Sequence, residues 1–227
     1  MNGIAKNEGW TIEYVFGTWA GNLDRLENFK IDILLDVSYS EKRASKYTLN
    51  NIFVIDDWLE AFTHKNSPIS SISELNGKRI GVLKGSIQEE FMLSDVKDKF
   101  GIELTVLSYS DYPEASQSLL NGETDVLVAS RFFYFSKERH EDIWPTAIVL
   151  RPAQVYFAFP ALQNVDIINA IDRNMIKLKN EPNSAYYKSL KCWLDSSYKN
   201  KFPEYLLWLL GISISLLLII SLFTIIL

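Results

Sequence analysis

An uncharged stretch at residues 206–227 constrains this chain more than any other feature. The residues in it that are not strongly apolar are small or hydroxylated: Gly211, Ser213, Ser215, Ser221 and Thr224. At about 1.5 Å per residue, a helix of this length reaches about 33 Å, enough to cross a ~30 Å hydrocarbon core. Tyr205 and Trp208 stand where aromatic side chains anchor a span at the membrane interface. We therefore predict one transmembrane helix at residues 204–227, and the alternative is a buried core helix, which would normally carry a polar stripe.

Both ends of the sequence favour a fragment of a longer protein. Met1 is followed by Asn2, Gly3, Ile4, Ala5 and Lys6, which open no apolar region of the kind that a secretory signal peptide contains. The chain then stops at Leu227, inside the hydrophobic run. A fragment is the expectation, and a natural tail-anchored protein is the alternative.

Composition excludes several classes of protein. A formal net charge of −5 argues against a general nucleic-acid binder, which would normally carry a basic face. A hydrophobic content of 48% is too high for a disordered chain. Cys192 is the one cysteine, so an internal disulfide framework and a multi-cysteine zinc site are excluded. His64 and His140 suggest no metal-ligand spacing, and no cofactor is expected.

Before the hydrophobic run, strand patterns alternate with helix patterns. Period-two or continuous apolar runs predict strands at residues 10–16, 31–35, 79–83, 103–107, 124–129 and 155–159. Helical spacing predicts helices at residues 19–26, 86–100, 114–120, 167–178 and 186–193. This alternation is typical of a parallel α/β sheet.

The turn at Gly85-Ser86 is the first candidate site. It follows a predicted strand and opens a helix, and Ser86 with Glu89 forms a capping-box pattern ahead of Ile87. Unpaired N–H groups and the helix dipole attract an anion there, and the glycine allows close approach. Such turns more often only cap a helix. The pattern is not a P-loop, because no G-x-x-x-x-G-K-[ST] motif is present.

Arg43 is the second candidate, because a guanidinium can hold a carboxylate through two parallel hydrogen bonds. A Ser-Glu-Lys-Arg turn is more often a solvated surface segment. Trp19, Trp58 and Tyr39 could form apolar or stacking walls, although such residues more often belong to a core.

Motifs for catalysis are weak. Ser86 lacks the second glycine of a nucleophile elbow. His140 lies in a charged run that is typical of a solvated surface, and Cys192 lies on a predicted amphipathic helix, where we expect a packed or inert thiol and not a nucleophile. We therefore expect no enzyme.

Several motifs in order along the chain resemble one known family. Gly17-Thr18-Trp19 precedes Lys30-Ile31-Asp32, which is similar to a "G-x-x-D" strand, and Ser40-Glu41-Lys42-Arg43 with Tyr47 resembles "T-x-E-R … F-S". Residues 72–82 with Gly85-Ser86 resemble "I-x-S-L-x-D-L-x-G-K-x-V-G-V", and residues 121–125 resemble "L-x-x-G-x-x-D-A". These motifs resemble the type 2 periplasmic-binding-protein fold, the solute-binding family 3 domain of amino-acid importers and membrane sensors. Residues 171–194 look like the version found on sensor histidine kinases and diguanylate cyclases.

The resemblance implies an α/β domain of two lobes over residues 1–200. The first lobe would comprise residues 1–64 and 155–200, and the second residues 70–150. The family fold opens with a strand that this chain would lack, so the first lobe is expected to be incomplete.

The resemblance also implies roles for the candidate residues. Arg43 would hold a ligand carboxylate in an inter-lobe cleft, and the backbone at Gly85, Ser86 and Ile87 would bind it from the other lobe. Trp19 and Tyr39 would line the cleft. Ser130 stands where importers carry an acid for the ligand ammonium, so that position does not supply α-amino specificity, and Arg131 beside it could favour a different anion.

Three functions follow as hypotheses. The first is a non-enzymatic sensor in the cell membrane, single-pass, with an extracytoplasmic domain that binds an amino acid or carboxylate and signals to a cytoplasmic module. The second is an anchored binding protein of an ABC-type amino-acid importer, and the third is an enzyme on the same fold. A homodimer is possible. Basic residues before the span would favour the opposite orientation, with the binding domain in the cytoplasm, by the positive-inside tendency. They are Lys188, Lys191, Lys199 and Lys201.

Overall fold

The computed structural model describes residues 1–137, 139–161, 164–195, 208–209 and 211–215. The chain divides into two compact units, Met1–Lys188 and Ser189–Leu227. Most of the membrane helix predicted at residues 204–227 therefore lies outside the described residues. Within the described ranges, no helix is both long and apolar enough to cross a bilayer.

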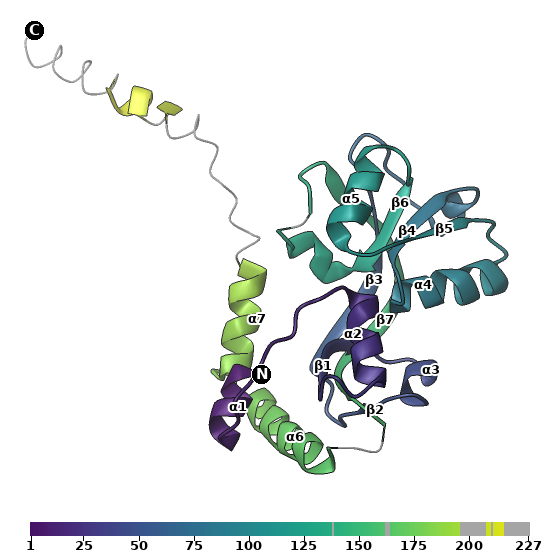
Figure 1. Cartoon of the computed structure of the whole chain (residues 1–227). Coiled ribbons are helices and arrows are strands. Elements are labelled where there is room, and N and C mark those ends of the chain that lie inside the picture. The colour runs from purple at the N-terminus through teal and green to yellow at the C-terminus, as the bar shows by residue number, and fades with distance from the viewer. Residues whose placement is uncertain (138, 162–163, 196–207, 210, 216–227) are drawn as a thin grey trace, which may run out of the picture. The chain divides into compact units, whose positions relative to one another are not determined.

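Helices and strands alternate through the first unit (Figure 1). The elements are α1 (Asn2–Glu8), α2 (Trp19–Glu27), β1 (Leu34–Ser38), α3 (Glu41–Ala44), β2 (Thr48–Leu49), β3 (Ile55–His64), η1 (Ile72–Leu75), β4 (Arg79–Leu83), α4 (Ile87–Phe91), the π-helical η2 (Met92–Lys99), β5 (Thr105–Tyr109), α5 (Tyr112–Leu120), β6 (Val126–Ser130), η3 (Arg131–Phe135), β7 (Ile143–Phe159), α6 (Val165–Asn180) and α7 (Ala185–Asp195).

The strands form one mixed sheet in the order β1-β7-β3-β6-β4-β5, with β2 also paired to β7. β4 pairs in parallel with β5 and β6, whereas β3 pairs antiparallel with β6 and β7, and β1 pairs antiparallel with β7. The expectation of a parallel sheet is therefore correct only for β4–β6. The sequence reading did not identify β3 or the first two thirds of β7, the two strands that join the parallel part to the rest.

Two lobes are defined by separate buried clusters that share β3 and β7. Lobe 1 contains α1–α3, β1, β2 and α6, and its core includes Leu26, Val37, Phe159 and Ile171. Lobe 2 contains β4–β6, α4, η2 and α5. Leu59, Ala61 and Phe62 of β3 pack in lobe 2, so the chain crosses between the lobes near Asp57, earlier than the predicted boundary at residue 64.

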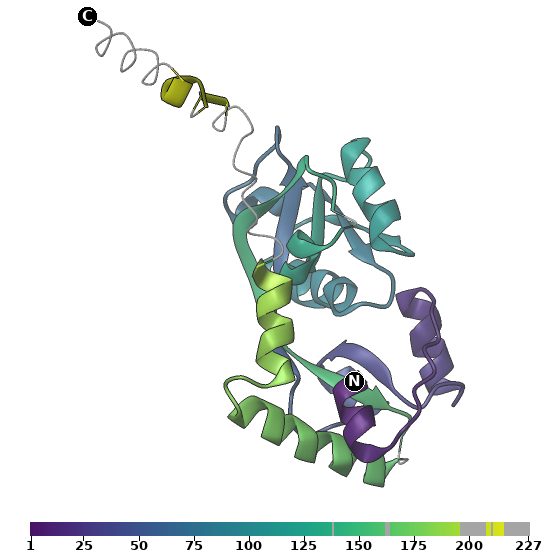
Figure 2. The same cartoon turned by 90° about the vertical axis from the view of Figure 1, so that its left-hand side faces the viewer.

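The strand predicted at residues 10–16 is absent. This segment runs from α1 to α2 without pairing to any described strand (Figure 2). Its side chains alternate as in a strand, but a strand also needs a neighbour that accepts its hydrogen bonds. β1 is the first strand in the sheet order, and its outer edge has no strand partner among the described residues.

Candidate functional site

Arg43 lies where the two lobes meet. Ser40 caps α3 by accepting a hydrogen bond from the Arg43 N–H at 3.3 Å, which fixes the start of this short helix. The Arg43 side chain is 5% exposed. Its Nη1 donates to the Ser38 carbonyl at 3.0 Å, and its Nη2 donates across the lobes to the Gly85 carbonyl at 3.2 Å. The structure therefore brings together the two candidates that the sequence singled out.

Trp19 joins the same contact from α2. Its Nε1 donates to the Gly85 carbonyl at 3.1 Å, and the Arg43 guanidinium lies 5.6 Å from the centre of its ring. Gly85 has φ of +72°, and a Cβ there would lie 3.3 Å from Leu23 Cδ1. A glycine is therefore needed both for the backbone conformation and for the close approach of α2.

The buried charge of Arg43 has no directly paired counterion among the described residues. Among the described residues, its guanidinium forms no ion pair, and three of its five N–H groups have no hydrogen-bond partner. Burial lowers the pKa of Arg43, while the charge of Glu90 opposes that shift. Since buried charges in proteins are normally paired, this arrangement is suited to an anionic ligand.

The helix start at Ser86 differs from the prediction in its details. Ser86 caps α4 by accepting from the Glu89 N–H at 3.2 Å. Glu89 does not complete the capping box, because its Oε2 accepts from the Gly85 N–H at 2.6 Å and its Oε1 from the Ser108 hydroxyl. The Ser86 N–H already donates a hydrogen bond to the Leu83 carbonyl at 3.1 Å.

The backbone groups left for an anion are therefore one position further along. Within the described residues, the N–H groups of Ile87 and Gln88 have no partner, as is usual for the first turn of a helix. The Ile87 side chain does not face this site but packs in the lobe 2 core, where it is 3% exposed.

Asp57 lies at the point where β3 crosses between the lobes. It is beside Ser130 and Arg131, the two site residues predicted at the end of β6. Its carboxylate is 6% exposed, and Oδ1 has no hydrogen-bond partner among the described residues. Burial raises the pKa of Asp57, although a hydrogen bond from the Ser130 hydroxyl opposes the shift. Arg131 Nε lies 3.7 Å from Asp57 Oδ1, and its guanidinium stacks 3.9 Å from the Trp58 ring centre.

A carboxylate does lie beside Ser130, contributed by a different strand. The acid expected at the end of β6 is absent, but Asp57 from the neighbouring strand places a carboxylate against Ser130. Arg131 is directed to Asp57 and to the Asp56 carbonyl, which its Nη2 reaches at 2.8 Å. It therefore acts on the acid and is not a second free positive group.

Asp36 is an exposed residue whose carboxyl lies within electrostatic range of both Arg43 and Asp57. It lies in an irregularity of β1 between Leu34 and Val37, with φ of 64°, a conformation that Asp tolerates better than most residues. Although the residue is exposed, partial loss of hydration raises the pKa of the Asp36 carboxyl to about 6, with a further contribution from the charge of Asp57 and an opposing one from Arg43. Sequence reasoning missed Asp36 and Asp57; the available signal was an acid inside an otherwise apolar strand and an acid pair next to Trp58.

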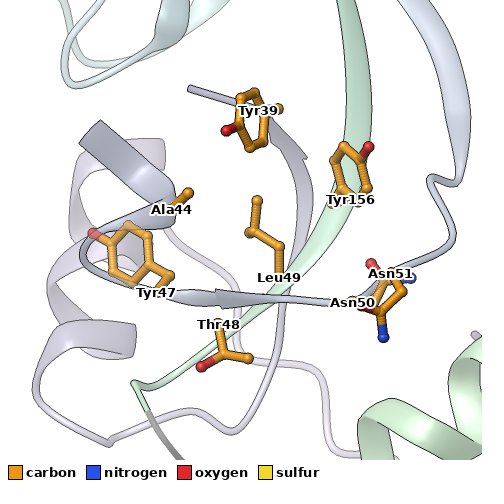
Figure 3. Close-up of a pocket in the computed structure, with 8 residues that line it drawn as sticks. All are labelled: Tyr39, Ala44, Tyr47, Thr48, Leu49, Asn50, Asn51 and Tyr156. Atoms are coloured by element: carbon orange, nitrogen blue, oxygen red, sulfur yellow. The ribbon is translucent and has the colours of Figure 1, made fainter. Parts of the chain in front are cut away.

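Among the described residues, no contact joins the side chains of Tyr39 and Arg43. It lines a separate pocket of about 440 Å³ on lobe 1, together with Tyr47, Leu49, Asn50 and Tyr156 (Figure 3). The rings of Tyr39 and Tyr156 are 6.4 Å apart and lie above Leu49 in this view. Tyr39 therefore lines a hollow on lobe 1, and its role in the inter-lobe cleft stays a prediction.

Comparisons with known proteins agree with this fold. The family model described as NMT1/THI5 like matches residues 54–143. The L-cystine-binding protein TcyJ of Escherichia coli is 29% identical over 131 residues, which cover 56% of this chain and 47% of that protein. The match thus spans about half the length of this relative.

Solved structures cover more of the chain. The amino acid ABC transporter substrate-binding protein AbpA of Streptococcus pneumoniae, solved with L-arginine, has a TM-score of 0.74 at 18% identity and covers 88% of this chain and 83% of its own. A histidine kinase sensor domain similar to periplasmic binding proteins has a TM-score of 0.73 at 19% identity, covering 85% and 82%. The chain has the type 2 periplasmic-binding-protein fold, and the predicted resemblance to solute-binding proteins is confirmed.

Proposed function

We propose that this protein binds a small α-amino acid at the junction of its two lobes. The observation that carries the proposal is the buried guanidinium of Arg43, which reaches both lobes and lacks a counterion among the described residues. A ligand carboxylate would supply the missing charge and accept from the free N–H groups of Arg43 and of Ile87.

The ligand ammonium would be held by Asp36 and Asp57. Asp57 Oδ1 is buried and accepts no hydrogen bond among the described residues, although Arg131 Nε lies 3.7 Å away, so an ammonium hydrogen bond there would remove an existing cost. A positive ligand group would also reduce the repulsion between the two acids. The combination of a cationic and an anionic subsite suits a zwitterion better than a simple carboxylate.

In the cell, the domain would act as a non-enzymatic sensor anchored by a membrane helix at residues 204–227. Ligand binding would stabilise the hydrogen bonds from Arg43 and Trp19 to Gly85 and so favour the closed state of the lobes. The movement that accompanies closure would be transmitted through α6 and α7 to the predicted span. The similarity to a histidine kinase sensor domain and the position of the apolar run after the binding domain support this reading. The alternative, an anchored binding protein of an amino-acid importer, is supported by the match to a cystine-binding protein.

A thermal-shift screen tests the binding function. The purified 227-residue chain is heated in detergent with each standard amino acid, with L-cystine and with carboxylates that lack an amino group. At 100 times Kd, a ligand stabilises the folded state by about 2.7 kcal/mol, or about 5–10 °C in melting temperature. At least one amino acid is expected to reach this shift. Equal stabilisation by the matching carboxylate without an amino group would refute the ammonium subsite, and no shift with any compound would refute the function.

The membrane placement predicts where Cys192 is accessible. This thiol is exposed and precedes the predicted span. In spheroplasts of the cells that make the protein, a membrane-impermeant maleimide is expected to label Cys192 without lysis. Washing membranes with carbonate should release a chain that ends at residue 203, whereas the full chain should remain in the membrane fraction. Labelling only after lysis would contradict the extracytoplasmic placement.

A further inference from the structure

Lobe 1 contains a cavity that shares no lining residue with the proposed amino-acid site, and we call it the tyrosine pocket. Its volume is about 440 Å³, within the range of about 300–1,000 Å³ that is typical of small-molecule sites. Figure 3 shows Tyr39, Leu49 and Tyr156 around its centre, with Asn51 towards one end and Tyr47 towards the other. The residues that line it are Tyr39, Ala44, Tyr47, Thr48, Leu49, Asn50, Asn51 and Tyr156.

The lining of the tyrosine pocket carries no formal charge. Burial raises the pKa of Tyr47 and of Tyr156 above the ordinary value of 10, so both hydroxyls stay protonated at neutral pH. The Tyr47 hydroxyl already donates to Glu27. The Asn51 amide already donates to Asp172. A charged ligand would lose hydration here without gaining a free opposite charge. The pocket is therefore suited to a neutral ligand.

Hydrogen bonds behind the lining fix the shape of the pocket. Both ends of the Asn50 amide are bonded, since Nδ2 donates to Asp172 Oδ1 at 2.9 Å and Oδ1 accepts from the Phe157 N–H at 2.9 Å. On the other side, the Tyr156 hydroxyl donates to Gln154 Oε1 at 3.0 Å. Walls held in this way lose little side-chain freedom when a ligand binds.

Two aromatic faces and two polar groups remain for a ligand. The ring centres of Tyr39 and Tyr156 are 6.4 Å apart, with the rings tilted by 58°. A ligand ring inserted between them would need about 7 Å, which is twice the optimal carbon–carbon contact distance. A ligand must therefore lie across both rings. Among the described residues, Asn51 Oδ1 and the Tyr39 hydroxyl have no hydrogen-bond partner.

A saturated ring with hydroxyl groups fits these contacts. The face of a tyrosine ring is electron-rich and attracts C–H groups of partial positive charge, which one face of a pyranose presents. Hydroxyl groups at the edge of a pyranose both donate and accept, so they can pair with Asn51 Oδ1 and with the Tyr39 hydroxyl. A flat hydrocarbon ring would leave both groups without partners.

We propose that the tyrosine pocket binds the pyranose ring of a neutral sugar. One C–H face of the sugar lies across Tyr39 and Tyr156, and a hydroxyl at its edge donates to Asn51 Oδ1. Because the pocket shares no lining residue with Arg43 or Asp57, a sugar and an amino acid bind independently. The inference goes beyond the proposed function and does not rest on it.

Saturation-transfer NMR on the full chain in phospholipid nanodiscs tests the proposal, since nanodiscs avoid detergents with sugar head groups. The probes are methyl β-glucopyranoside and methyl β-galactopyranoside. The controls are glucuronate and glucosamine, which are charged, and phenol, which is flat. At least one of the two probes is expected to receive saturation at its ring C–H protons. Each control is expected to bind at least threefold more weakly by titration.

Tyrosine variants locate the bound sugar. Tyr39→Ala and Tyr156→Ala are each expected to raise the Kd of the pyranoside at least tenfold, because each removes one aromatic face. Tyr39→Phe keeps the ring and should raise Kd less than fivefold. Tyr14→Ala is the matched control and should leave Kd unchanged, since Tyr14 lies outside the pocket and is 49% exposed, against 47% for Tyr39. Circular dichroism verifies that each variant is folded.

Three results would overturn the proposal. The first is no saturation of either pyranoside. The second is parent-like affinity of a folded Tyr39→Ala. The third is binding of glucuronate, glucosamine or phenol as tight as that of the better pyranoside. Arg43→Ala separates the two sites, because it should keep the parent Kd for the pyranoside. Displacement of the sugar by an amino acid would also contradict the proposal, whereas sugar binding without any amino-acid ligand would refute only the proposed function.

Discussion

Replacement of Arg43 by alanine is expected to weaken binding of the amino acid by about 100-fold in Kd. Removal of one partner of a buried charge-assisted contact costs about 3 kcal/mol, and each 1.4 kcal/mol corresponds to a factor of ten. The change also removes one of the two described hydrogen bonds from lobe 1 to the Gly85 carbonyl and leaves the one from Trp19, so the closed arrangement is less favoured. Calorimetric titration with the strongest ligand from the screen measures the effect.

Two further variants separate the charge of Arg43 from its geometry. Arg43→Lys keeps a positive charge but not the planar fork that reaches both Ser38 and Gly85, so it should bind more weakly than the parent and more tightly than Arg43→Ala. Lys42→Ala removes an exposed charge at the next position and should leave Kd unchanged. Circular dichroism confirms that each variant is folded. Parent-like affinity of a folded Arg43→Ala would show that this residue does not hold the ligand.

Replacement of Asp172 by alanine is expected to destabilise the protein by about 3 kcal/mol, or about 6–12 °C in melting temperature. Asp172 lies on α6 and is 8% exposed. Its two oxygens accept hydrogen bonds from the backbone of Asn51 and Ile52 and from the side chains of Asn50 and Asn51, at 2.7–3.1 Å. It thereby fixes the turn that leads from β2 to β3, and alanine would leave several donors without an acceptor.

The loss should depend on pH. Burial opposes the ionisation of Asp172, but the hydrogen bonds from Ile52, Asn50 and Asn51 outweigh it and lower the pKa of this carboxyl from its ordinary value of 3.8. A lowered pKa stabilises the folded state above pH 3.8, and this contribution is lost as pH falls through the lower folded-state value. The difference in melting temperature between parent and Asp172→Ala is therefore expected to be full at pH 7 and to shrink only in strong acid.

A second acid on the same helix provides the control for this prediction. Asp166 lies exposed in the first turn of α6, and alanine there should cost at most about 1 kcal/mol. Equal losses for Asp166→Ala and Asp172→Ala, or a difference that does not change with pH, would contradict the role assigned to the Asp172 network.

The pairing of Arg43 with Gly85 was predictable from the sequence only with the family resemblance. Each signal is weak when it stands alone, because an arginine turn and a helix cap are common surface features. Their separation of 42 residues carries no information about contact until the order of lobes is known. The resemblance supplied that order, and the structure places the two residues together.

Other features depended on tertiary structure that local patterns do not carry. Residues 10–16 alternate correctly for a strand, but the pattern says nothing about whether a neighbouring strand is available. β7 contains Pro145 and Pro152, which argue against a long strand. They are tolerated because β1 pairs only with residues 155–158, so the first part of β7 has a free side.

The acids of the site were missed for a related reason. Asp36 is directed by an irregularity in β1, and Asp57 is close to Ser130 because β3 and β6 are neighbours. Both facts follow from strand register, which the residue pattern within a single segment does not specify. The absence of an acid at Ser130 therefore indicated a lost ammonium site, whereas the structure shows a carboxylate contributed by the adjacent strand.

A crystal structure of the protein with the strongest ligand from the thermal screen tests the central claim most directly. The ligand carboxylate is expected within hydrogen-bond distance of the Arg43 guanidinium and of the Ile87 N–H, and the ammonium within reach of Asp36 or Asp57. A ligand bound instead in the Tyr39–Tyr156 pocket of lobe 1, with Arg43 still bonded only to the Ser38 and Gly85 carbonyls, would contradict it.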